Sequence, residues 1–132
     1  MERKAFSILL AAALIFSAGP LFSQSLDLSG MWVGETVIPD VADKDQVTLV
    51  LTKEGESYSG NVTDSMGLAN ESPLEKVEFK DNTLTAEFVI FNGQEYVRIF
   101  LTLTVTGERL VGEWQSEDGE TGPLDLERKK TA

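Results

Sequence analysis

The sequence predicts an all-β domain: an eight-stranded antiparallel up-and-down meander that closes into a small barrel. From Leu28 onward, apolar and polar residues alternate in short segments, and no stretch of about 11 residues keeps a helical period. Turn residues separate these segments at short intervals. Closure is expected because an open sheet of eight strands would expose two edges and one apolar face.

The first four predicted strands are each bounded by residues that favour turns. Residues 30–38 form the first strand, which ends at Pro39. Residues 46–53 form the second, because Val47, Leu49 and Leu51 fall on one face and the two threonines on the other. A Glu-Gly-Glu turn leads to residues 57–63, and a longer loop leads to residues 73–80.

The last four predicted strands show the clearest alternation. Residues 83–91 are followed by the Asn92-Gly93 pair, which predicts a type I′ hairpin turn because both central residues of that turn need a positive φ. Residues 94–106 then alternate without interruption, and residues 109–116 and 121–128 complete the meander.

The N-terminal residues predict a signal peptide, residues 1–23, in front of one barrel domain, residues 24–132. A charged start precedes an apolar run from Ala5 to Phe16, which is shorter than the roughly 20 residues that span a bilayer. Small residues allow cleavage after Ser23 or after Ser25. We therefore expect an exported chain, periplasmic or extracellular, that is soluble and free of the membrane after cleavage.

The charge and the missing residue types exclude many functions. The chain has 22 acidic and 11 basic residues, a formal net charge of −11, and neither Cys nor His. The charge argues against a nucleic-acid partner, which requires a basic surface. Chemistry that depends on a catalytic Cys, a Ser-His-Asp triad, zinc fingers or His-ligated haem is excluded. We therefore predict a protein that is not an enzyme and uses no cofactor.

Two acidic loops raise the alternative of a calcium site, because carboxylate oxygens are the ligands that calcium prefers. One loop contains Asp40, Asp43 and Asp45, and the other contains Glu117, Asp118 and Glu120. Neither has the spacing of a known calcium loop. We interpret both as solvated turns and predict no metal site.

Residues at the two ends of the mature chain carry a family resemblance. The first strand opens with Gly30-Met31-Trp32, and the last strand ends with Arg128. This pairing resembles the calycin pattern, and the chain is similar to small secreted lipocalin-like domains of bacteria. The resemblance implies that Gly30, Trp32 and Arg128 close one end of the barrel, with the cation stacked on the indole.

Four aromatic residues are the predicted wall of a binding pocket, since such pockets are mostly apolar: Trp32, Tyr58, Phe88 and Trp114. Core packing is the alternative interpretation of the same side chains. Our preferred hypothesis is an exported barrel that binds a small apolar or amphipathic ligand.

Further apolar residues fall on the opposite, outward face of the strands, which favours burial against a partner. The predicted interaction face consists of Val89, Phe91, Tyr96 and Phe100. A homodimer or another protein would cover it; the alternative is a bulge that turns these residues to the inward face. The alternative functions are thus a protein-interaction or inhibitor-like module, and an accessory domain of a secreted enzyme.

Overall fold

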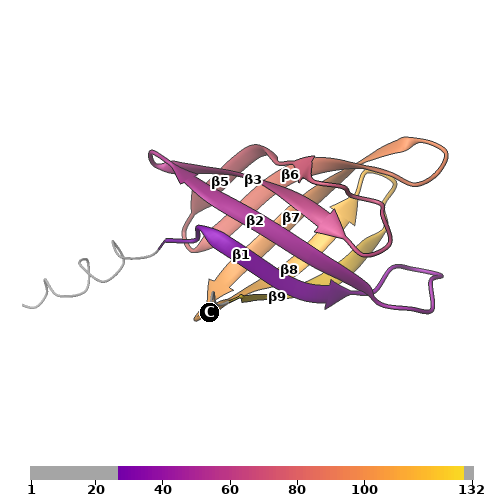
Figure 1. Cartoon of the computed structure of the whole chain (residues 1–132), viewed down its shortest axis with the longest axis horizontal. Helices are drawn as coiled ribbons and strands as arrows, with labels where there is room; N and C mark the ends of the chain where they lie inside the picture. The colour runs from indigo at the N-terminus through magenta and orange to yellow at the C-terminus, as the bar shows by residue number, and fades with distance from the viewer. Residues whose placement is uncertain (1–26, 130–132) are drawn as a thin grey trace, which may run out of the picture.

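The computed structural model describes residues 27–129, which form one sheet of nine antiparallel strands (Figure 1). The strands are β1 (Gly30–Thr36), β2 (Asp45–Glu54), β3 (Ser57–Asp64), β4 (Ser72–Pro73), β5 (Glu75–Lys80), β6 (Thr83–Phe91), β7 (Tyr96–Thr106), β8 (Arg109–Ser116) and β9 (Thr121–Arg128). Their spatial order is β4-β3-β2-β1-β9-β8-β7-β6-β5. Pairing of β1 with β9 joins the first strand to the last. The predicted all-β, up-and-down meander is confirmed.

The strand count is nine rather than eight because the predicted strand 73–80 is divided. Its first part, β4, pairs with β3, and its second part, β5, pairs with β6. The register shifts between Glu75 and Glu78, and Lys76 has a φ of 50°. The chain passes from one edge of the sheet to the other at Leu74, between β4 and β5, and the bulge follows within β5. The segment thereby brings the barrel close to closure.

The remaining seam lies between β3 and β5, and side chains fill it. The rings of Tyr58 and Phe79 meet edge to face, with their centres 6.2 Å apart. The backbone nitrogen of Leu74 donates to the carbonyl oxygen of Gly60 at 2.9 Å. An edge-to-face aromatic contact adds stabilisation beyond its buried area. The result is a nearly closed barrel with its apolar residues inside.

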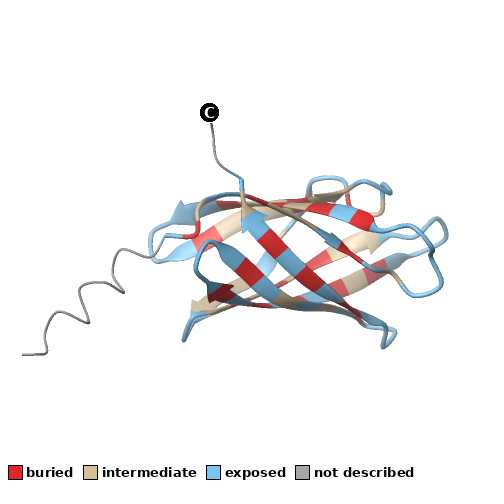
Figure 2. Cartoon of the chain, turned by 90° about the horizontal axis from the view of Figure 1, so that it is seen from below, coloured by how far each residue is buried: buried red, intermediate tan, exposed pale blue. Residues whose placement is uncertain are grey.

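The alternation predicted from the sequence determines which side chains form the core. Buried and exposed residues alternate along the strands (Figure 2). On β7, every second residue from Val97 to Val105 is buried, and the residues between them face outward. Successive side chains of a strand point to opposite faces, so the apolar set fills the interior.

One close approach between strands explains a glycine in β8. A Cβ atom added at Gly112 would overlap the carbonyl oxygen of Thr102 on β7. A glycine inside a strand often marks such an approach or a sharp bend. Gly112 therefore lets β8 curve tightly against β7, as the small barrel requires.

The Asn92-Gly93 prediction is wrong in its turn type. Four residues, 92–95, link β6 to β7, and of the predicted pair only Gly93 has a positive φ, 102°. The side-chain Oδ1 of Asn92 instead accepts hydrogen bonds from the backbone nitrogens of the third and fourth loop residues. The two-residue turn with positive φ at both positions is Asp81-Asn82, between β5 and β6.

The barrel has two unlike ends. The open end carries the longer loops, residues 37–44, 65–71, 92–95 and 117–120, on the right of Figure 1. The closed end carries the short turns 55–56, 81–82 and 107–108, together with the segment 27–29 that precedes β1.

The predicted signal peptide, residues 1–23, lies outside the described residues. Residues 27–129 contain no helix that is long and apolar enough to cross a membrane.

Candidate functional site

Trp32 and Arg128 meet at the closed end. The Trp32 side chain is fully buried, and its Nε1 donates to the carbonyl oxygen of Leu28 at 2.9 Å. The guanidinium carbon of Arg128 lies 4.3 Å from the centre of the indole. Arg128 also donates to the carbonyl oxygens of Ser29 at 2.7 Å and Asp27 at 2.8 Å. These contacts fasten segment 27–29 across the end of the barrel.

Two neighbours complete this closure. The hydroxyl oxygen of Tyr58 accepts a hydrogen bond from the backbone nitrogen of Leu28 at 3.0 Å. A Cβ atom added at Gly30 would lie 3.3 Å from Nη1 of Arg128, so glycine leaves room for the guanidinium. Trp32 and Tyr58 therefore pack at the closed end.

The open end holds a cavity of about 280 Å³. Its wall is mainly the inward aliphatic and aromatic side chains of the strands: Val47, Leu49, Val62, Phe88, Ile90, Val97, Ile99, Leu101, Trp114, Leu124 and Leu126. Of the four predicted wall residues, Phe88 and Trp114 lie here. The structure places Trp32 and Tyr58 outside this wall, because their inward positions lie near the closed end, where segment 27–29 covers them.

Hydrogen bonds hold Trp114 in place on the wall. Its Nε1 donates to Oγ1 of Thr36 at 2.8 Å, and that hydroxyl donates to the carbonyl oxygen of Pro123 at 2.5 Å. A Cβ atom added at Gly122 would lie 2.7 Å from Nε1 of Trp114, so glycine makes room for the indole. The chain of bonds satisfies the polar edge of the indole and fixes the ring.

A ring of polar residues surrounds the cavity at the open end. Each lies two positions along the chain from the inward apolar or glycine residue nearest the open end, and so continues the inward face of its strand. The six residues are Thr36, Asp45, Asp64, Asn92, Ser116 and Glu120. Asp118 also lines the cavity. All four ionisable residues in this part of the wall, Asp45, Asp64, Asp118 and Glu120, are acidic.

Asp45 and Asp64 form a carboxyl pair within this ring. Asp45 is 3% exposed, and its Oδ1 accepts hydrogen bonds from Oγ of Ser65 at 3.1 Å and the backbone nitrogen of Met66 at 3.2 Å. Oδ1 of Asp64 accepts from the backbone nitrogen of Ala69 at 2.8 Å. Burial, and then the adjoining Asp64 carboxyl, raise the pKa of Asp45 from 3.8 to about 6, although the bonds from the loop oppose the change.

The raised pKa predicts a pH-dependent contribution to stability. The folded state holds the Asp45 proton more tightly than the unfolded state, so this contribution is complete below about pH 4 and is lost as the pH rises through about 6. Urea unfolding of the wild type and of Asp45→Asn from about pH 4 to 7 measures it. The wild type should lose up to about 3 kcal/mol relative to the variant across this range. A difference that does not vary with pH would contradict the assignment.

The interpretation of Asp45 as part of a solvated loop is wrong. Asp40 and Asp43 are exposed, but Asp45 belongs to β2 and points inward. The signal was present in the sequence: Asp45 precedes Val47 by two positions, so the alternation of β2 places both on one face. Within residues 27–129, no group of three or more Asp and Glu side chains could hold a metal ion.

The predicted interaction face lies on the outside of β6 and β7. The rings of Phe91 and Tyr96 contact each other with their centres 4.9 Å apart, and Tyr96 is 73% exposed. Val89 is half-buried and Phe100 is 38% exposed. All four side chains therefore face outward, and the two exposed rings gather beside the open end.

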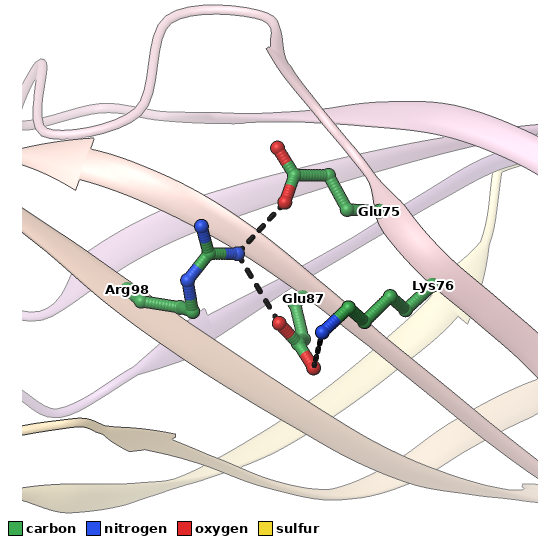
Figure 3. A network of polar contacts seen from close by, with 4 residues as sticks. All are labelled: Glu75, Lys76, Glu87 and Arg98. Carbon is green, nitrogen blue, oxygen red and sulfur yellow. Dashed lines mark hydrogen bonds and ion pairs between the residues drawn. The ribbon is translucent and has the colours of Figure 1, made fainter.

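A network of charged residues, drawn in Figure 3, lies on the same side of these strands. Nη1 of Arg98 lies 2.7 Å from Glu75 and 3.1 Å from Glu87, and Nζ of Lys76 lies 4.0 Å from Glu87. In the register, Arg98 stands opposite Val89. Exposed ion pairs of this kind stabilise little by themselves, but here they separate the Phe91 and Tyr96 rings from Phe100. The face is a mixed surface and not a continuous apolar patch.

No family model, curated protein or solved structure matches the chain. The open end combines an apolar interior with an acidic mouth.

Proposed function

We propose that this protein is an exported, non-enzymatic, lipocalin-like barrel that binds one small apolar or amphipathic molecule in the cavity at its open end. The observation that carries the proposal is the apolar cavity of about 280 Å³. Ligand sites are mostly apolar hollows with a few polar groups, commonly of about 300 Å³ or more. The nearly closed barrel and the stacking of Arg128 on Trp32 support the lipocalin-like assignment, and the pattern of residues 1–23 supports export.

The size of the cavity suggests the size of its ligand. An apolar cavity of about 150 Å³ accepts benzene, so about 280 Å³ corresponds to a body of roughly 11 non-hydrogen atoms. A longer molecule would extend through the mouth between the loops. The tightly packed closed end leaves the open end as the route of entry.

Calorimetric titration with 2-phenylethanol, a neutral molecule of suitable size, tests the proposal. We expect the full chain to bind one molecule, and Val97→Phe to weaken binding at least about tenfold, because the larger side chain occupies cavity volume. The matched control is Val89→Phe, which adds the same ring on the outer face of β6 and should leave binding unchanged.

A second cavity variant keeps the test valid if Val97→Phe does not fold. Ala69→Met adds volume from the loop between β3 and β4, where Ala69 lines the cavity. Circular dichroism checks that each variant keeps its strands. Unchanged binding in both folded cavity variants would refute the proposal, and so would absence of wild-type binding by 2-phenylethanol and by its charged analogues alike.

The second candidate function is attachment of another protein, or of a second copy of this chain, to the outer face. Its support is the exposed Phe91 and Tyr96 pair. The same surface would serve an accessory domain of a secreted enzyme. Because the ion pairs around Arg98 interrupt the apolar outer face, this face supports binding less strongly than the cavity does.

A further inference from the structure

The acidic pair at the cavity mouth has an unused acceptor. Oδ2 of Asp64 is buried and has no hydrogen-bond partner among the described residues. Asp45, beside it, is 3% exposed. A buried acceptor without a donor is costly and calls for an explanation, such as a missing ligand.

The two carboxyl groups are held in place by one loop. The hydrogen bonds from Ser65, Met66 and Ala69 all use the Oδ1 atoms. This arrangement orients both side chains and leaves the unpartnered oxygen of Asp64 for another donor. Both residues line the cavity, so either the proton of a neutral Asp45 carboxyl or a donor on a molecule inside the cavity would fill that place.

The surrounding charges are all of one sign. The neighbouring elements contribute Thr36 from β1, opposite Asp45, and Asp118 and Glu120 from the loop between β8 and β9. Lys44 precedes Asp45, but its Nζ lies 4.0 Å from Glu35 and it is not part of the cavity wall. A cation at the mouth would therefore be attracted, and a carboxylate would be repelled.

We infer that the ligand of this cavity is an amphipathic cation, with an apolar body among the aliphatic side chains and a protonated amine bonded to Asp45 and Asp64. This inference rests on the proposed function and names the class of ligand. The ammonium group supplies the donors that the buried oxygen lacks, and bonds between charged groups are the stronger kind.

A proton and the amine compete for the same position. Without ligand, the raised pKa of Asp45 lets the pair hold a proton near pH 6, as carboxyl groups that share a site do. Aliphatic amines remain protonated to about pH 10. Affinity for the amine should therefore increase as the pH rises through about 6, whereas affinity for a neutral analogue should not.

Three probes of similar shape test the inference by calorimetry on the full chain: 2-phenylethylamine, 2-phenylethanol and phenylacetate. At pH 7.5 we expect the amine to bind at least about tenfold more tightly than the alcohol, and phenylacetate to bind more weakly than both. The preference for the amine should fall between about pH 7 and pH 5.

Two substitutions locate the cation. Asp64→Asn and Asp45→Asn should each reduce the preference for the amine while keeping the affinity for 2-phenylethanol, which also reports that the barrel is folded. Asp43→Asn, at an exposed loop position, is the matched control and should retain the full preference.

The outcomes separate this inference from the proposed function. Equal binding of amine and alcohol would overturn the inference and leave the proposed function standing. A preference for the amine that survives both substitutions would also overturn it, because the cation would lie elsewhere. Absence of binding by all three probes would overturn both.

Discussion

Trp32→Ala should lower the free energy of unfolding by roughly 3 to 5 kcal/mol, the range for removing a large buried aromatic side chain. Trp32 is fully buried, donates to the carbonyl oxygen of Leu28 and lies under Arg128. Its removal would leave a large void and release segment 27–29 from the end of the barrel. Urea unfolding followed by circular dichroism measures the loss.

The control for this prediction is an aromatic residue without such contacts in the core. Tyr96 is 73% exposed, so Tyr96→Ala should change stability by no more than about 0.5 kcal/mol. A loss below about 1 kcal/mol for Trp32→Ala would fall well short of the range for a buried tryptophan. It would show that the indole does not close the barrel.

Gly112→Ala should lower stability by about 3 kcal/mol, the upper part of the usual range for overpacking. The added Cβ would overlap the carbonyl oxygen of Thr102, which is backbone and cannot rotate away. The strands β7 and β8 would have to separate at this point. Thermal and urea unfolding of the purified variant measure the effect.

The neighbouring position supplies the comparison. Glu113 is exposed on the outer side of β8, so Glu113→Ala should change stability by no more than about 0.5 kcal/mol. Similar stabilities of Gly112→Ala and Glu113→Ala would mean that the two strands are not in close contact.

Most strand positions follow from local rules. The alternation in β2 and β7 depends on residues that are neighbours in sequence, so the inward faces are readable directly. The division of residues 73–80 into β4 and β5 cannot be read from neighbouring residues, because it depends on two edges of the sheet that meet in space. The loop at Asn92 differs from its predicted turn because the Asn92 side chain makes the hydrogen bonds that organise it.

Less of the candidate site than of the fold could be predicted from the sequence. Phe88 and Trp114 were predicted for the wall and line the cavity, but aromatic character alone does not tell which end of a barrel a residue faces. That depends on the distance of each inward position from the open end. Asp45 was missed because it was grouped with acidic neighbours in a loop, and Asp64 because it was assigned to the loop that follows residues 57–63, whereas their phase in β2 and β3 directs both inward.

Location of a bound probe tests the central claim, that the open-end cavity is the binding site. Nuclear Overhauser effects between the ring protons of 2-phenylethanol and protein methyl groups report contacts within a few ångströms. We predict contacts to Leu49, Leu101 and Leu124, which line the cavity. Contacts confined to Val89 or Val111 on the outer face, or none at saturating probe, would contradict the claim.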